Sequence, residues 1–160
     1  GKSVSGYAMR CDFDFGTGDT FDAERIAAAE KFAESYLAYI CGGGAWKDPA
    51  NEKAFNDNYN ALKAQMIEGT AGYVGVMESY RDVNLMPKYD SFTVDSKTAT
   101  DLVAYTDKSL SCRVEFSVTR TRTVDGAAQT DTLTGSISVL QVLYKGEWRV
   151  WSFVYAPTVE

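Results

Sequence analysis

The chain has 160 residues, of which 45% are hydrophobic, a formal net charge of −6 and a pI near 4.7. A chain of this size builds a single hydrophobic core, and its acidic balance argues against nucleic acid and anionic lipid as partners, because both require a basic surface. The sequence contains no histidine, which excludes Ser-His and Cys-His nucleophile pairs and most zinc or non-haem iron sites. We therefore expect one domain over residues 19–160, without a metal or another cofactor.

Apolar and polar residues alternate between Tyr7 and Phe15, which indicates an edge strand in an N-terminal arm over residues 1–18. The sequence begins with Gly1 and shows no signal-peptide pattern and no apolar run of about 20 residues, so we expect no membrane insertion of this segment. We expect a trimmed chain whose signal peptide or anchor preceded Gly1. The expected location is extracytoplasmic, either secreted or membrane-anchored.

The first half of the chain has helical periodicity. Apolar residues at helical spacing predict a first helix over roughly residues 21–41, ended by three consecutive glycines. Pro49 in a first helical position predicts the start of a second helix that runs to about residue 68. Between Gly69 and Pro87, a third, kinked helix is favoured over an irregular crossover.

From residue 88 the periodicity changes to two, which predicts an antiparallel meander. Gly135 interrupts the alternation and is a candidate β-bulge that would curve the sheet. Arg113, Arg120 and Arg122 are balanced by nearby acids and are interpreted as part of a solvated strand face. The strands are expected over residues 89–95, 102–105, 111–124, 132–144 and 147–156.

The closing strand carries large apolar side chains on both of its faces. Trp148, Val150 and Val154 alternate and are predicted to face the core, whereas the opposite face carries the aromatic residues Trp151, Phe153 and Tyr155. A sheet with helices on one face leaves the other face to water or to a partner. The three aromatic residues are therefore the predicted interface for a protein partner or for a homodimer.

Three cysteines, Cys11, Cys41 and Cys112, are present and no C-x-x-C element occurs. Buried cysteine often serves as a small core hydrophobe, and this interpretation is favoured over a disulfide. If a bridge forms, the extended segments around Cys11 and Cys112 make that pair the first choice.

Two amphipathic helices, a crossover, and long antiparallel strands ending in the segment Gly146-Glu147-Trp148-Arg149-Val150 resemble the nuclear-transport-factor-2-like superfamily of cystatin-like α+β cones. The resemblance covers roughly residues 20–156. It implies N-terminal helices packed on the concave side of a strongly curved antiparallel β-sheet, which together form a cone. The superfamily includes enzymes such as ketosteroid isomerase, and also non-catalytic extracytoplasmic subunits of conjugation and type IV secretion machines.

Tyr36, Tyr39 and Tyr59 lie on the helices that would line such a cone, and Asp107 lies near a strand turn. An isomerase or lyase needs a carboxylate base and a neutral donor in a water-poor pocket. The spacing of these four residues in the sequence does not indicate that they act together in one site. Tyrosines at helical intervals are more often core or rim residues. The sequence favours a non-catalytic extracytoplasmic binding or protein-interaction domain, part of an anchored envelope or conjugation-type assembly. A cone that binds a small apolar molecule and a ketosteroid-isomerase-like enzyme are the alternatives.

Overall fold

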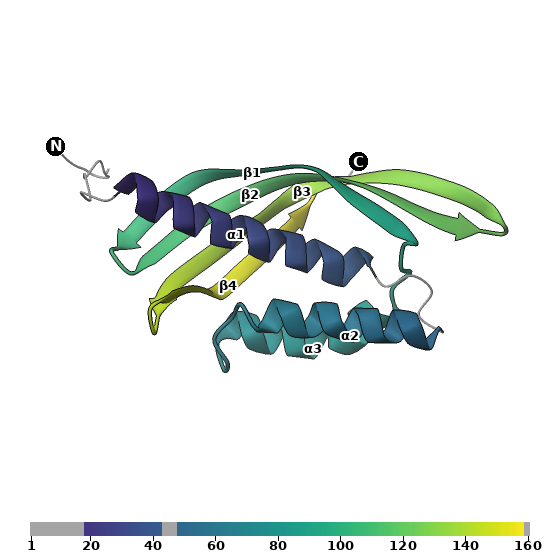
Figure 1. Ribbon diagram of the computed structural model, residues 1–160, viewed down its shortest axis with the longest axis horizontal. Helices are drawn as coiled ribbons and strands as arrows, with labels where there is room; N and C mark the ends of the chain where they lie inside the picture. Colours follow the sequence, from purple (N-terminus) through teal and green to yellow (C-terminus); the bar gives the residue numbers. More distant parts are fainter. Residues whose placement is uncertain (1–17, 43–47, 159–160) are drawn as a thin grey trace.

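A computed structural model describes residues 18–42 and 48–158, in which three helices precede a four-stranded antiparallel sheet (Figure 1). The strand order in the sheet follows the order in the chain, so the expected α+β meander is confirmed. The predicted N-terminal strand and Cys11 lie outside the described residues. The elements are α1 (Gly18–Cys41), α2 (Pro49–Lys63), α3 (Ala71–Leu85), β1 (Ser91–Thr106), β2 (Ser109–Val124), β3 (Ala127–Tyr144) and β4 (Glu147–Pro157).

The second helix begins where its sequence predicts. The Asp48 side chain accepts a hydrogen bond from the amide of Ala50 at 2.9 Å, and Pro49 occupies the first turn. The helix ends at Lys63, earlier than the predicted residue 68. The reason is tertiary, because the carbonyl of Gln65 accepts a hydrogen bond from Val150 at the edge of β4 at 2.9 Å. The backbone after Lys63 thus pairs with the sheet.

The third helix, which the sequence favoured over a crossover, is confirmed. Thr70 is its N-cap residue, and its side chain accepts a hydrogen bond from the amide of Tyr73. The helix ends at Leu85, before Pro87. In the described part of the chain, no helix has the length and hydropathy that crossing a bilayer requires.

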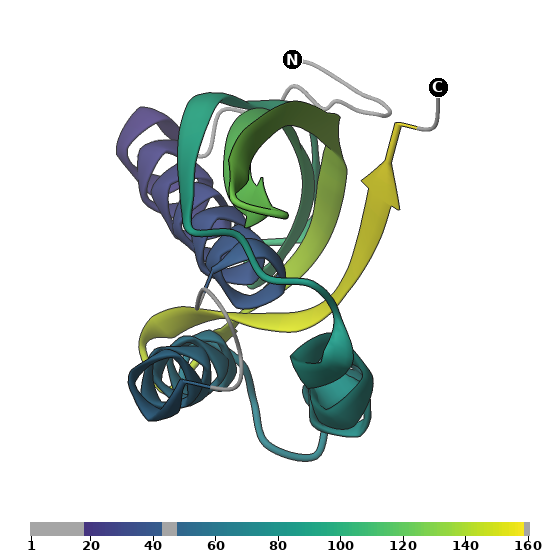
Figure 2. The same cartoon turned by 90° about the vertical axis from the view of Figure 1, so that its right-hand side faces the viewer.

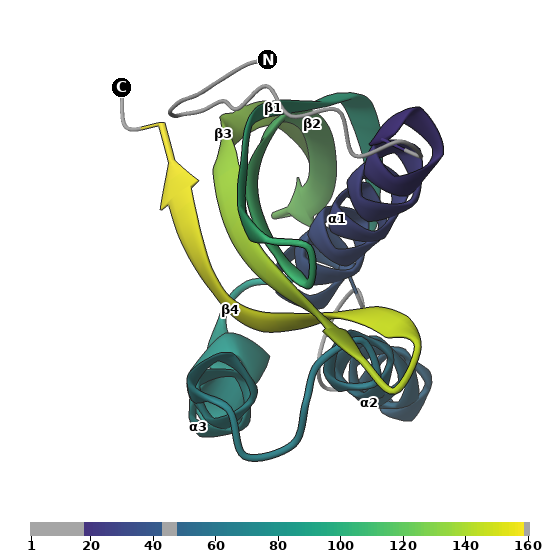
Figure 3. The same cartoon turned by 90° about the vertical axis from the view of Figure 1, so that its left-hand side faces the viewer.

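The sheet has an inner and an outer face that the register defines. Even-numbered residues of β2 pair with odd-numbered residues of β3 on the inner face, as Val114 does with Ile137, and both of these residues are buried. The two segments predicted as short strands within residues 89–105 form the single strand β1, whose register with β2 shifts three times. End-on, the sheet bends strongly, with α1 on its concave side and with α2 and α3 next to β4 (Figures 2 and 3).

Gly135 is not a β-bulge, because it pairs in regular register with both Phe116 and Pro157. Its backbone φ is 156°, and a Cβ atom at this position would lie 2.5 Å from the carbonyl oxygen of Ala156. The glycine therefore allows β4 to approach β3 closely. The register shifts that accompany the bending of the sheet lie in β1 and β4.

Candidate functional site

One helical tyrosine of the predicted ligand site, Tyr36, packs on the concave side of the sheet. The ring of Tyr36 lies 5.0 Å from that of Phe153 and 5.2 Å from that of Tyr155, between α1 and β4. The ring of Phe32 contacts Phe153 at 5.1 Å. Each distance is typical of edge-on or tilted aromatic pairs, so these rings pack on each other across the space between helix and sheet.

Tyr39 and Tyr59 belong to a second group of rings, between the three helices. The ring of Tyr39 stacks on Phe55 at 5.4 Å and lies 5.9 Å from Tyr59, and its hydroxyl is 3.0 Å from that of Ser79. Burial is the main cause that raises the pKa of the Tyr36 and Tyr39 phenols above the ordinary value. Both phenols are neutral at physiological pH, so they can act as hydrogen-bond donors but not as bases.

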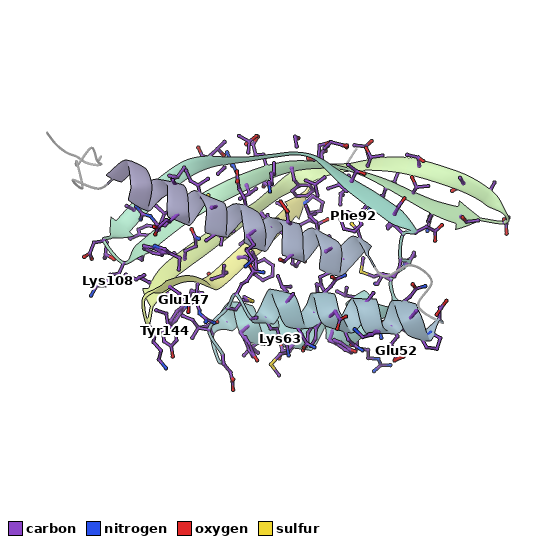
Figure 4. All side chains as sticks on the ribbon, in the orientation of Figure 1. Glu52, Lys63, Phe92, Lys108, Tyr144 and Glu147 are labelled. Atoms are coloured by element: carbon purple, nitrogen blue, oxygen red, sulfur yellow. The ribbon has the colours of Figure 1, made fainter. Side chains whose placement is uncertain are left out.

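Asp107 is not part of this cluster. It lies exposed in the turn that joins β1 to β2, next to Lys108 at the end of the sheet that is near the N-terminus of α1 (Figure 4). Tyr36 and Tyr39 lie in the C-terminal half of α1. The structure therefore brings the three predicted tyrosines together and leaves the predicted carboxylate apart, because sequence spacing does not report which end of the sheet a turn occupies.

Two carboxylates on the concave side, Glu34 and Asp131, are paired with cations. Glu34 of α1 forms an ion pair with Lys97 of β1. Asp131 of β3 accepts two hydrogen bonds from the Arg120 guanidinium, at 2.7 and 3.0 Å. The Arg120 guanidinium thus occupies both oxygens of Asp131, as expected for a two-point pairing of an arginine with a carboxylate.

The sequence assigned Arg120 and Arg113 to one solvated strand face. For Arg120 this prediction is wrong. Its side chain is only 19% exposed, and its guanidinium lies 4.4 Å from the ring of Tyr89. The sequence does carry a signal for this placement, since Arg120 has the same parity as Val118, which is buried on the inner face. Arg113 lies on the outer face and pairs with Asp101.

Cys41 and Cys112 are buried free thiols, in agreement with their interpretation as small core residues. Burial raises the pKa of the Cys112 thiol to about 11, and the charges of Glu30 and Asp101 add to this shift. Burial also raises the pKa of Cys41, although Arg120 partly opposes it. Both thiols are protonated and weakly nucleophilic at neutral pH. Among residues 18–42 and 48–158, no group of His, Cys, Asp or Glu side chains could hold a metal ion.

β4 changes its inner and outer faces at Trp151. The register between β3 and β4 shifts by one residue between Leu140 and Gln141, and this leaves Trp151 without a partner in β3. The extra residue inverts the alternation of side chains in the rest of the strand. Phe153 and Tyr155 consequently point to the concave side, where they contact α1.

The predicted grouping of Trp151, Phe153 and Tyr155 on one outer face is therefore wrong, because it assumed an uninterrupted alternation. Val154, which was predicted in the core, is 65% exposed, whereas Val150 before the bulge is buried as predicted. Trp151 itself is 44% exposed. Of the three predicted interface residues, only Trp151 is a large exposed side chain.

Apolar side chains of three strands lie in neighbouring rows on the outer face. Val103 of β1 pairs with Ser111 of β2, which pairs with Leu140 of β3, and the adjacent rows carry Val142 and Val154. Val103 is 47% exposed. We name Val103, Leu140, Val142 and Val154 the outer sheet patch, beside which Trp151 lies on the β4 bulge.

A polar hollow of about 490 Å³ adjoins this patch on the same face. Hydroxyl groups of Ser96, Thr98 and Ser136 line it together with Arg113 and Glu115, and Arg113 lies 3.6 Å from Glu115. Apolar rows flanked by paired charges are typical of protein interfaces, which have an apolar centre and a polar rim.

No protein-family model and no curated protein matches this chain. Solved structures do resemble it. An Ntf2-like protein involved in plasmid conjugation has 15% identity and a TM-score of 0.55, over 88% of this chain and 50% of that protein, so this chain spans about half of its length. A putative scytalone dehydratase from Novosphingobium aromaticivorans has 9% identity and a TM-score of 0.57, over 88% of this chain and 89% of the other.

An IcmL-like type IV secretion system protein from Legionella pneumophila has 10% identity and a TM-score of 0.50, over 86% of this chain and 94% of the other. Identities this low show a shared fold and leave activity open. The similarity covers 86 to 88% of this chain, which agrees with the resemblance found in the sequence. The chain therefore has the nuclear-transport-factor-2-like α+β fold.

Proposed function

We propose that this domain binds a protein partner through the outer sheet patch, with a second copy of the chain as the first candidate, and that it performs no catalysis. The observation that carries this proposal is the contrast between the two faces of one sheet. Aromatic rings from α1 and β4 pack together on the concave side. On the outer face, Val154 and Val103 remain 65% and 47% exposed. Apolar side chains grouped in this way mark interaction surfaces.

The surroundings of the patch also support a protein interface. Ion pairs flank the apolar rows, formed by Arg113 with Asp101 on one side and by Arg149 with Glu147 on the other. Trp151 adds a large exposed ring, and tryptophan is enriched among residues that contribute most to binding energy.

The concave side offers little support for an enzyme of the isomerase type. Such an enzyme needs an unpaired carboxylate beside a neutral donor. The neutral donors Tyr36 and Tyr39 are present, but Glu34 and Asp131 are held by cations, and Glu30 interacts with the Cys112 thiol. We therefore favour binding over catalysis.

We further propose an extracytoplasmic assembly as the setting. The proposal is supported by the descriptions of two similar structures, one involved in plasmid conjugation and one from a type IV secretion system. The apolar outer face provides the surface that a subunit of such an assembly needs.

The test is light scattering coupled to gel filtration, for the wild type and two variants. Val154→Glu places a charge in the proposed contact, and Thr93→Glu places the same charge at an exposed position of the outer face on β1, outside the patch. We expect a dimeric wild type, a monomeric but folded Val154→Glu variant, and a dimeric Thr93→Glu variant. A wild type that stays monomeric at its highest soluble concentration would contradict self-association, as would equal effects of both variants.

A further inference from the structure

A separate hollow of about 440 Å³ opens where the C-terminal end of α2 meets the β3–β4 hairpin. Met66, which is buried, and Ile67 contribute apolar lining, and Tyr73 and Tyr144 add aromatic rings. Lys63 lies at the end of α2 that faces the hairpin with Tyr144 (Figure 4). The volume is within the range of small-molecule sites. The hollow shares no residue with the outer sheet patch itself, although Arg149, which flanks the patch, also lines the hollow.

Lys63 supplies a positive charge to the hollow, and no carboxylate among the described residues forms an ion pair with it. Its ammonium lies 4.1 Å from the ring centre of Tyr59 and 5.8 Å from that of Tyr73, so aromatic faces hold it in place. Within the described ranges, the ion pairs of lysine side chains involve Lys53 and Lys97 and not Lys63. An ammonium has three N–H donors, which remain available to an anionic ligand.

Arg149 is a second cation of the hollow, and its position is fixed. Its Nη1 group donates to the carbonyl oxygens of Ala64 at 3.0 Å and of Met66 at 3.2 Å, just beyond the last residue of α2. These bonds satisfy carbonyls that a helix end leaves without partners. Glu68 is the acid that lines the hollow, and it is exposed, so that water screens its charge.

We propose that this hollow binds a small aromatic carboxylate. The carboxylate pairs with Lys63, and the ring packs on the tyrosine and methionine side chains of the lining. An ammonium beside the rings of Tyr73 and Tyr144 favours a ligand with one negative charge and a flat ring over a sugar or a polyphosphate. The site lies outside the interior of the cone, and the proposal does not depend on the proposed protein interface.

The test uses benzoate as the probe, with binding followed by the amide shifts of a ¹⁵N-labelled sample. Benzamide has nearly the same shape without the charge. Lys63→Met removes the proposed partner of the carboxylate, and Lys53→Met is the matched control on the same helix, where the lysine is 78% exposed and pairs with Asp57. A fragment of this size binds in about the millimolar range.

We expect benzoate to shift amides around the hollow and to bind about tenfold more tightly than benzamide, since one partly buried charge pair contributes about that factor. Lys63→Met should lower the affinity for benzoate about tenfold and leave that for benzamide unchanged, and Lys53→Met should change neither. Tyr144→Ala, at a side chain that is 39% exposed, should weaken both probes. The proposal is overturned if titration with benzoate gives no saturable amide shifts around the hollow, or if benzoate and benzamide bind with equal affinity. It is also overturned if Lys63→Met and Lys53→Met change the affinity for benzoate equally.

Discussion

The β4 bulge makes opposite predictions for two neighbouring residues, Phe153 and Val154. Phe153 points inward and contacts Phe32 at 5.1 Å and Tyr36 at 5.0 Å, whereas Val154 is 65% exposed. Truncation to alanine should therefore destabilise the protein at position 153 and have almost no effect at position 154. An uninterrupted strand would reverse this order.

The magnitude follows from the contacts. Replacing a buried phenylalanine with alanine costs about 3 to 5 kcal/mol of unfolding free energy, and because Phe153 is partly exposed we take the lower end, about 3 kcal/mol. For a domain of this size, that loss corresponds to a fall in Tm of about 6 to 12 °C. Val154→Ala should change the unfolding free energy by less than about 0.5 kcal/mol.

Urea unfolding followed by circular dichroism measures both variants against the wild type. Phe153→Ala should lower the midpoint without changing the slope, because the folded state and the surface exposed on unfolding stay the same. If Val154→Ala proves the more destabilising of the two, the bulge at Trp151 is misplaced. The definition of the outer sheet patch would then fail with it.

Two further predictions concern the glycines Gly135 and Gly75 and the phenol of Tyr36. Gly135→Ala should destabilise the protein by about 1 to 3 kcal/mol in urea unfolding, since the new Cβ would lie 2.5 Å from the Ala156 carbonyl oxygen. Gly75→Ala in α3 should instead stabilise the protein by about 0.5 to 1 kcal/mol, because no atom lies within 4 Å of the new Cβ. Equal effects would contradict the close approach of β4. Burial raises the pKa of Tyr36 above its ordinary value of 10.0, so its contribution to stability is complete below pH 10 and is lost as the pH rises further. Tyr36→Phe should reduce the fall in stability above pH 10, and an unchanged alkaline unfolding curve would show that other groups cause it.

The sequence alone determined the helices, the order of the strands and the main core-facing pattern. Asp48 and Pro49 specify the start of α2 through local capping, and the period-two pattern of β2 correctly places Val114 and Val118 in the core. Both signals depend only on residues near one another in the chain. The helical periodicity of α1 likewise placed Tyr36 on the face that packs against the sheet.

The tertiary structure decided the placement of the candidate sites. Asp107 had no local signal for the end of the sheet at which it lies, and the partners of Arg149 just beyond α2 are 85 and 83 residues away in the chain. Lys63 becomes part of a hollow only because the backbone after α2 pairs with β4.

The faces of β4 illustrate the physical limit of the sequence. Alternation along a strand predicts two faces, but it does not report where one extra residue enters the pairing with the neighbouring strand. Trp151 has no partner because the register of β4 against β3 shifts by one residue there, and every side chain beyond it changes face. The sequence therefore determined that β4 is a strand with aromatic residues. Only the pairing of the two strands decided that Phe153 enters the core and that Val154 remains exposed.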